Sequence, residues 1–425
     1  MTSETEYKEA FVWIWLPNAT EPVVAGVLTQ VEGDIHFNYG TSYLDRKNSI
    51  AIYDPELPLE AGDIPPGPGL SMPGCIRDAS PDAWGRRVLI NRKLGLKGKD
   101  ADREDLSEMA YLLESGSDRV GALDFQLSAT TYTPRITDQA SLEELMQSAE
   151  RVEQGLPLRP DLDKALQHGS SLGGARPKAL INTDDKKFIA KFSKSADLYN
   201  VVKAEFIAMR LAKLAGLNVA NVKLTSALGK DVLLIERFDR EKRKQGWLRT
   251  PIVSALTLFG LDEMMVAYTS YQDLADIIRH RFTDPAPTLR ELYARIVFNI
   301  LCGNTDDHAR NHAAFWDGRN LTLTPAYDIC PQPRTGNEAT QAMFIHGNNK
   351  MSQMTTCLAA APNFHLDTET AKSIIVHQVR TIKTHWASIC DEAALTETDR
   401  QFFWHRQFLN QFAFYGAPPE INESS

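Results

Sequence analysis

The 425-residue sequence has few cysteines, and their number and spacing argue against two common kinds of cysteine site. None of them forms a C-x-x-C pair, and the count is odd, which argues against a disulfide framework and a structural zinc site. We therefore expect reduced thiols and a cytoplasmic protein. The five are Cys75, Cys302, Cys330, Cys357 and Cys390.

Long apolar runs, an export signal and an excess of positive charge are also missing. No apolar run approaches the roughly 18 residues that a membrane-spanning helix needs. The first six residues are acidic and lack the charged-then-apolar pattern of a signal peptide. The net charge of -9 gives no overall field for nucleic acid. A local basic cluster is expected to be a solvated loop or a small basic patch; it comprises Arg237, Arg240, Lys242, Arg243 and Lys244.

The order of predicted elements indicates three parts, which the length allows. Four short strands are predicted over 10–16, 22–28, 34–39 and 49–53, in a mixed α/β subdomain that ends near residue 100. A β-rich part follows over 101–238. The part from 239 to 425 is mainly helical, and its predicted helices span 273–282, 287–301, 368–385 and 396–415.

The most informative stretch reads GNTDDHARN over 303–311 and is followed by TPAYD over 324–328. It comes directly after an apolar helix, and Gly303 is a plausible helix stop. Phosphoryl transfer needs a carboxylate that accepts a hydroxyl proton, and an Asn and a second Asp that hold magnesium. Asp306, Asn311 and Asp328 match this order. Asp-rich loops are commonly solvated turns, but the second Asp and the upstream motifs favour the kinase interpretation.

A loop of small residues over 168–178 lies ahead of two predicted strands, 179–182 and 187–192. Glycines in such a loop let backbone N–H groups approach phosphate oxygens, although a flexible linker has the same composition. Lys191 lies on the second strand, where a kinase lysine reaches the phosphates. A lone lysine there can also be an edge charge. Glu205, near the start of a helix over 200–216, is either its ion-pair partner or a solvated side chain.

An apolar strand over 231–235 runs into Glu236, Arg237 and Phe238. This is the position at which a hinge between two lobes would present backbone groups to an adenine. The elements thus follow the order β-rich lobe, hinge and helical lobe, and they agree with one another.

Together these motifs resemble the HipA-like serine/threonine kinases of bacterial toxin–antitoxin modules. The resemblance covers about residues 10–415 and implies an α+β, bilobal, kinase-like fold with an N-terminal α/β subdomain and a mainly helical C-terminal lobe. It also implies ATP and Mg²⁺. It depends on DASPDAWGR (78–86), SLGGARPK (171–178), IAKF (189–192), IERFDR (235–240), the stretch 303–311 and LTPAYD (323–328).

The resemblance also implies a role for each matching residue. Asp306, rather than Asp307, becomes the general base, because the Asn must follow five residues downstream. Ser171 becomes the autophosphorylated serine, with Ser170 as an adjacent competing acceptor. Glu205 would support Lys191, the phosphate-binding lysine. The remaining implied site residues are the phosphate loop of Gly173, Gly174, Ala175, Arg176, Pro177 and Lys178, the hinge of Glu236, Arg237 and Phe238, the magnesium ligands Asn311 and Asp328, and the ATP-site residues His308 and Tyr327.

The function implied by the resemblance is that of a growth-arresting protein kinase toxin. Family targets include aminoacyl-tRNA synthetases, and the usual partner is a small helix-turn-helix (HipB-like) antitoxin that also binds operator DNA. The acidic charge fits a kinase that reaches DNA only through a basic partner. Two alternatives stay open: a small-molecule phosphotransferase of kinase-like fold, and a nucleotide-binding corepressor without kinase activity.

Overall fold

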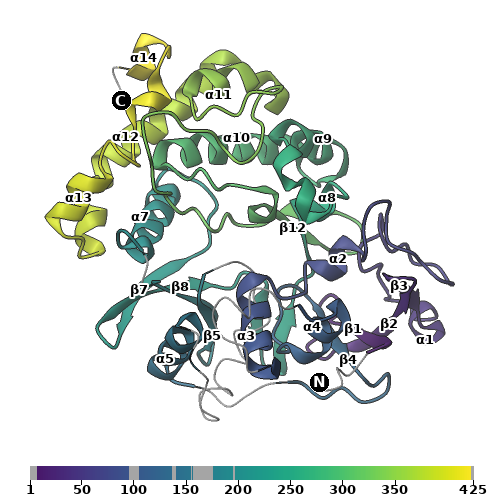
Figure 1. The fold of residues 1–425 in the computed structure, drawn as a ribbon. Coiled ribbons are helices and arrows are strands. Elements are labelled where there is room, and N and C mark those ends of the chain that lie inside the picture. Colours follow the sequence, from purple (N-terminus) through teal and green to yellow (C-terminus); the bar gives the residue numbers. More distant parts are fainter. Residues whose placement is uncertain are drawn as a thin grey trace. The chain divides into compact units, whose positions relative to one another are not determined.

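The computed structural model describes residues 7–94, 105–135, 140–154, 156, 176–194 and 197–422. The chain divides into two units, and each unit is built from three separate chain segments. Figure 1 shows the course of the chain. Unit 1 comprises Met1–Ala196, Thr225–Val253 and Phe315–Arg319; unit 2 comprises Asp197–Leu224, Ser254–Ala314 and Asn320–Ser425. This division differs from the predicted three parts, because residues 197–224 group with the C-terminal helices and residues 239–253 group with the N-terminal part. The predicted α+β class is confirmed.

Unit 1 begins with a four-stranded sheet in the order β3-β2-β1-β4. The pairs β1–β2, β2–β3 and β1–β4 are antiparallel. Three of the four strands predicted for this region are therefore confirmed. The elements are β1 (Glu9–Ile14), β2 (Val23–Val31), β3 (Asp34–Tyr39), β4 (Leu123–Gln126), α1 (Thr41–Leu44), α2 (Gly74–Arg77), α3 (Ala83–Leu94) and α4 (Glu108–Glu114).

The strand predicted over 49–53 is wrong. Residues 51–53 are buried, but the backbone of the segment bonds to tyrosine hydroxyl groups instead of a neighbouring strand. The Ile52 N–H donates to the Tyr39 hydroxyl at 2.9 Å, and the Tyr43 hydroxyl donates to the Ile50 carbonyl at 2.7 Å. The alternating apolar pattern thus correctly indicated burial and incorrectly indicated a sheet.

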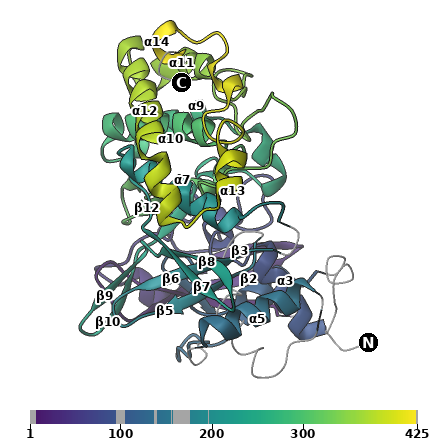
Figure 2. The same ribbon diagram turned by 90° about the vertical axis from the view of Figure 1, so that its left-hand side faces the viewer.

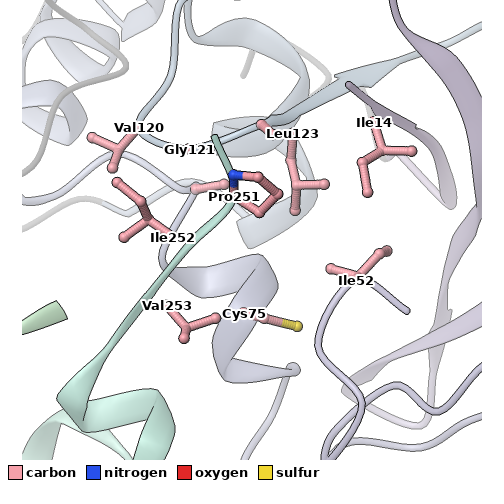
Figure 3. A pocket seen from close by; sticks show the side chains of 11 residues that line it. Ile14, Ile52, Cys75, Val120, Gly121, Leu123, Pro251, Ile252 and Val253 are labelled. Atoms are coloured by element: carbon pink, nitrogen blue, oxygen red, sulfur yellow. The ribbon is translucent and has the colours of Figure 1, made fainter. Parts of the chain in front are cut away.

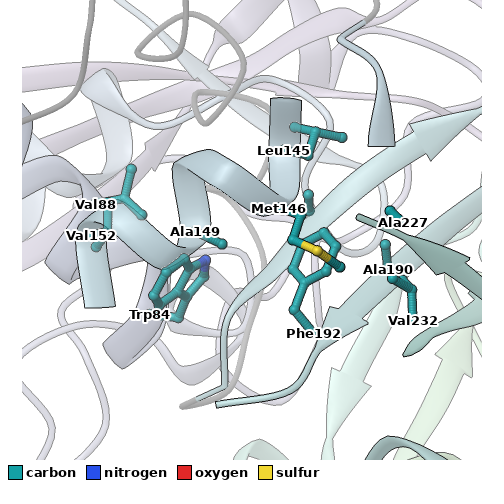
Figure 4. Close-up of a cluster of buried hydrophobic side chains, with 11 residues drawn as sticks. Trp84, Val88, Leu145, Met146, Ala149, Val152, Ala190, Phe192, Ala227 and Val232 are labelled. Carbon is teal, nitrogen blue, oxygen red and sulfur yellow. The ribbon is translucent and has the colours of Figure 1, made fainter. Parts of the chain in front are cut away.

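A second sheet of unit 1 has the order β5-β6-β8-β7. Its strands are β5 (Lys178–Asn182), β6 (Lys187–Phe192), β8 (Lys230–Glu236) and β7 (Val222–Ala227), of which 225–227 belong to unit 1. Helix α5 (Leu142–Glu153) begins at a capping box in which Ser141 and Glu144 satisfy each other's backbone N–H groups. Trp84 from α3, Met146 from α5, and Phe192 and Val232 from the sheet form one buried cluster (Figure 4).

The basic cluster at 237–244 is only partly a loop. Residues from Arg240 onward form an antiparallel hairpin at one end of the second sheet (Figure 2). Arg237 and Arg240 are buried, whereas Lys242 and Arg243 are exposed. The strands are β9 (Arg240–Arg243) and β10 (Gly246–Arg249), and β11 (Ile252–Ser254) follows.

A short late stretch, Phe315–Arg319, completes unit 1. The Trp316 indole N–H donates to the Ala51 carbonyl at 2.9 Å, and its ring meets Tyr53 edge-on. Gly318 has φ 98°, and a Cβ there would lie 2.6 Å from Ile50. These contacts pack the stretch directly against residues 50–53.

Unit 2 is mainly helical and is built around α10 (Pro285–Cys302), which lies among α9, α11 and α12 (Figure 1). Leu292, Ile296 and Ile300 are almost completely buried, as their helical spacing predicts. The other elements are α7 (Val201–Leu214), α8 (Ala255–Leu258), η2 (Glu263–Tyr268), α9 (Tyr271–Arg281), η3 (Ala309–Asn311), β12 (Ala313–Trp316, of which 313–314 belong to unit 2), β13 (Leu321–Leu323), α11 (Met354–Ala360), η4 (Ala361–Phe364), α12 (Thr368–Glu392), α13 (Glu397–Phe403), η5 (Gln411–Phe414) and α14 (Pro419–Asn422).

The single helix predicted over 396–415 is wrong. Helix α13 ends at Phe403, and the chain then passes through left-handed residues at His405 (φ 59°) and Leu409 (φ 53°) before η5. The Leu409 N–H donates to the Leu301 carbonyl at 2.7 Å. This tertiary hydrogen bond near the end of α10 belongs to a turn that a continuous helix would not make.

All five cysteines are buried and unbonded to one another, so the expected lack of disulfides is confirmed. Burial raises the pKa of Cys302 and Cys357 to about 12. In the described part of the chain, no helix has both the length and the apolar character required to cross a membrane.

Candidate functional site

Gly303 ends α10 and starts the loop that carries the candidate catalytic residues. It adopts φ 75°, in the left-handed region, and its N–H donates to the Ile300 carbonyl at 3.2 Å. A Cβ at this position would lie 2.8 Å from the backbone oxygen of Gln407. Glycine is therefore required both by the backbone conformation and by the neighbouring chain.

We predict that Gly303→Ala lowers the free energy of unfolding by about 1–3 kcal/mol, the usual range for a strained left-handed residue, because strain and steric overlap add. Urea unfolding followed by circular dichroism measures the loss. Gly216→Ala is the matched control, since Gly216 in the same unit has φ 87° but no atom within 4 Å of an added Cβ. Equal losses in the two variants would contradict the role of the Gln407 contact.

The loop after Gly303 exposes one carboxylate on a fixed backbone. The Asp306 carbonyl accepts hydrogen bonds from the His308 N–H at 2.9 Å and from the Asn311 side-chain amide at 3.0 Å. The Asp306 N–H donates to the Asn304 side chain at 3.3 Å. With its backbone held on both sides, Asp306 presents an exposed carboxylate to solvent.

Asp328 lies beside this loop in a left-handed conformation, with φ 59°. The Asn304 side-chain amide donates to the Asn299 side chain at 3.0 Å and to the Asp328 carbonyl at 3.4 Å. The Tyr327 hydroxyl donates to the Arg310 carbonyl at 2.8 Å. Unit 2 thus brings Asp306, Asn311 and Asp328 together, with His308 and Tyr327 next to them.

The pKa of Asp306 is raised. Partial desolvation is the largest cause; the nearby His308 opposes it, and the carboxylates of Asp328 and Asp307 add to it. Two carboxylates that disfavour each other's charge favour a cation between or beside them. Of the described residues, no group of three or more His, Cys, Asp and Glu side chains suits a metal by itself. One amide oxygen from Asn311 and one carboxylate from Asp328 instead suit Mg²⁺ shared with phosphate oxygens.

Asp307 has a different environment from that of its neighbour. It is buried, and one of its carboxylate oxygens receives the Tyr271 hydroxyl, the Asn299 side-chain amide at 2.7 Å and the His312 Nε2 at 2.9 Å. Burial alone would raise the pKa of Asp307, but His312 and Tyr271 outweigh it and lower the pKa. This carboxylate holds the loop to α9 and α10. A signal was available in the sequence: Asn299 is a polar residue within an otherwise apolar helix segment.

In unit 1, the structure places Lys178 of the predicted phosphate loop beside the predicted phosphate-binding lysine, Lys191. Lys178 on β5 lies directly opposite Lys191 on β6, and both are buried. Their cross-strand pairing puts both ammonium groups on one face of the sheet. Arg176 and Pro177 are also described, whereas the predictions for Ser170, Ser171, Gly173, Gly174 and Ala175 lie outside the described residues.

Glu205 and the predicted hinge residues differ from one another in burial. Glu205 on α7 of unit 2 is only 2% exposed, so the solvated alternative is wrong. Glu236 and Phe238 are partly exposed, and the Glu236 carboxylate receives Lys186 at 2.8 Å. The Arg237 side chain is buried and bonds to carboxylates within unit 1, so it is part of a structural network.

A separate pocket in unit 1 has mainly apolar walls, formed by Ile14, Ile52, Cys75, Pro251 and Ile252 among others (Figure 3). Its lining residues include no lysine, aspartate or asparagine. This pocket therefore lacks the groups that phosphate transfer needs.

Comparison with protein families agrees with the motifs. Residues 170–386 match the HipA-like C-terminal domain, and residues 18–126 match the HipA N-terminal domain. The chain belongs to the HipA-like family. The resemblance found in the sequence is thereby confirmed, and the match to the HipA N-terminal domain ends at residue 126, the last residue of β4.

Two curated relatives of this HipA-like chain are named kinases. The putative kinase Y4mE of Sinorhizobium fredii is 27% identical over 335 residues, which cover 72% of this chain and 74% of that protein. The serine/threonine-protein kinase toxin HipA of Shewanella oneidensis is 29% identical over 186 residues, 37% of this chain and 42% of that protein.

One solved structure shares the fold over nearly the whole length. HipA in the Shewanella oneidensis MR-1 complex of HipA, HipB and operator DNA superimposes with a TM-score of 0.68 at 21% identity. The match covers 94% of this chain and 97% of that one. The HipA-like architecture therefore extends across both units.

Proposed function

We propose that this HipA-like chain is an ATP- and Mg²⁺-dependent protein serine/threonine kinase that acts as the toxin of a toxin–antitoxin module. The observation that carries the proposal is the loop in which an exposed Asp306 lies beside Asn311 and Asp328. The kinase and toxin names of the relatives support it.

In this proposal Asp306 accepts the proton of the substrate hydroxyl as it attacks the terminal phosphate. Lys178 and Lys191 bind and neutralise phosphate oxygens, and the segment Glu236–Phe238 borders the adenine. Asn311 and Asp328 would hold Mg²⁺, which when bound neutralises charge on the phosphates. Asp307 keeps the catalytic loop in place, so that Asp306 needs no rearrangement during the reaction.

The proposed protein substrate is a translation component such as an aminoacyl-tRNA synthetase, and the proposed self-modification site is Ser171. Phosphate on Ser171 would add nearly two negative charges next to the phosphate loop and displace it, which would switch the enzyme off. The proposed partner is a helix-turn-helix antitoxin that connects the chain to operator DNA. The named complex of the structural neighbour, HipA with HipB and DNA, supports this partner.

The test is transfer of labelled phosphate from ATP, with Mg²⁺, to dephosphorylated protein and to a cell lysate. We expect label on Ser171 and on one lysate protein. Ser171→Ala should lose only the self-label, and Asp306→Ala should lose both. Label on a small molecule alone would favour the phosphotransferase, and ATP binding without any transfer would favour the corepressor.

A further inference from the structure

Asp118 is a buried carboxylate that lies between α4 and β4, within the stretch matched by the HipA N-terminal domain. One of its oxygens accepts from Arg237 Nη1 at 3.0 Å and from Arg240 Nε and Nη2 at 3.1 and 3.0 Å. Its other oxygen receives the Lys187 ammonium group. Three cations that belong to the second sheet and its hairpin therefore converge on one carboxylate from the N-terminal domain.

A second carboxylate closes the same network. The Arg237 guanidinium donates to Asp239 at 2.9 and 2.7 Å, and the Gly121 N–H donates to Asp239 at 2.8 Å. Arg240 Nη1 donates to the Gly121 carbonyl at 2.8 Å. Burial alone would raise the pKa of Asp118, but Arg237, Arg240 and Lys187 hold it well below its usual range, so the carboxylate stays charged near neutral pH.

The network contacts only one side of the extended segment 236–239. Arg237 and Asp239 are buried, whereas Glu236 and Phe238, which alternate with them, are partly exposed. The Arg237 N–H also continues the ladder with β6 by donating to the Lys187 carbonyl at 2.8 Å. The N-terminal domain therefore fixes the buried side of this segment. Glu236 and Phe238 lie on its other side, where Glu236 pairs with Lys186 and the Phe238 ring meets Phe315 edge-on.

We propose that Asp118 is a positioning residue for the nucleotide: through Arg237 and Arg240, the N-terminal domain sets the geometry of the segment that binds the adenine of ATP. This inference rests on the proposed function. Without the Asp118 charge, the guanidinium groups of Arg237 and Arg240 and the Lys187 ammonium group have less negative charge beside them. The segment 236–239 then shifts so that water can reach these groups. ATP binding then weakens, while the chemistry on the catalytic loop of unit 2 is unchanged at saturating ATP.

The experiment compares Asp118→Asn with Asp124→Asn in the full chain. Asp124 is a matched control, because it is fully buried in the same unit and pairs with Arg119 at 3.0 Å and Arg135 at 2.7 Å. Fluorescence titration with a mant-labelled ATP and Mg²⁺ measures affinity, and the self-phosphorylation rate at saturating ATP measures turnover. We expect Asp118→Asn to weaken binding about tenfold with turnover within about twofold, and Asp124→Asn to bind within about twofold of the unmodified protein.

Unchanged binding in Asp118→Asn, or equal weakening in both variants, would overturn the inference and leave the proposed function intact. Failure of the unmodified protein to bind the nucleotide would instead overturn the proposed function. If circular dichroism shows that Asp118→Asn does not fold, the same binding measurement is made on Arg240→Lys. This variant keeps the positive charge but loses the two hydrogen bonds from Nε and Nη2 to Asp118. Weaker binding in folded Arg240→Lys supports the inference, and unchanged binding overturns it.

Discussion

Replacing Asp306 with asparagine is expected to slow phosphate transfer by a factor of about 100 to 10,000, the usual contribution of a general base. The fold should be almost unaffected, with a change in unfolding free energy within about 0.5 kcal/mol, because the side chain is exposed. The hydrogen bonds that the Asp306 carbonyl accepts from the His308 N–H and the Asn311 side chain stay in place in this variant. Initial rates of labelled-phosphate transfer and urea unfolding measure the two effects.

The pH dependence of the unmodified enzyme follows from the same site. A general base works only when deprotonated, and partial desolvation raises the pKa of Asp306. The kcat/KM value should therefore fall, as pH decreases, at a pH above the ordinary pKa of an aspartate. In Asp306→Asn this acid limb should disappear from the residual rate. An Asp306→Asn enzyme with an unchanged rate and an unchanged limb would exclude Asp306 as the base.

Replacing Asp307 with asparagine is expected to destabilise the fold, whereas Asp306→Asn leaves the stability almost unchanged. It should lower the free energy of unfolding by about 3 kcal/mol, because a buried acceptor of three hydrogen bonds loses its charge and presents an amide to Tyr271, Asn299 and His312. The catalytic loop loses its connection to α9 and α10, so activity should fall together with stability. Urea unfolding monitored by circular dichroism gives the first quantity.

Asp306→Asn and Asp307→Asn can be compared directly in both activity and stability, because the chemical change is the same. Each changes one aspartate to asparagine, and only the surroundings differ. Loss of activity without loss of stability in Asp307→Asn, together with an active Asp306→Asn, would reverse the assignment of the base. A stable Asp307→Asn with normal activity would remove the structural role inferred from its three partners.

Features that depend on local sequence were predicted well. The apolar face of α10 and the end of that helix at Gly303 follow from residues within a few turns of each other, and the structure has both. The spacing within GNTDDHARN selects Asp306 over Asp307 as the candidate base, and this assignment stays a prediction. The structure adds a physical difference, since one carboxylate is exposed and the other is buried.

Features that depend on distant partners were not predictable in the same way. Arg237 and Arg240 belong to a charged run that is typical of surface loops, and their partner Asp118 lies 119 and 122 positions away. Similarly, the segment 49–53 has a strand-like pattern, but tyrosine side chains supply its hydrogen bonds. Hydrophobic periodicity indicates which residues are buried. It does not indicate which distant groups will form hydrogen bonds or ion pairs with them.

The placement of Phe315–Arg319 in unit 1 has a consequence for synthesis on the ribosome. Unit 1 contains the first 196 residues, yet Trp316 must emerge before it can bond to Ala51 and pack on Tyr53. Domains commonly fold in order as they leave the exit tunnel. Unit 1 can therefore complete its packing only after residues 315–319 have been synthesised, which happens after the loop 303–311 has been translated. A nascent chain stalled before residue 315 would therefore carry the residues of the catalytic loop without a finished unit 1.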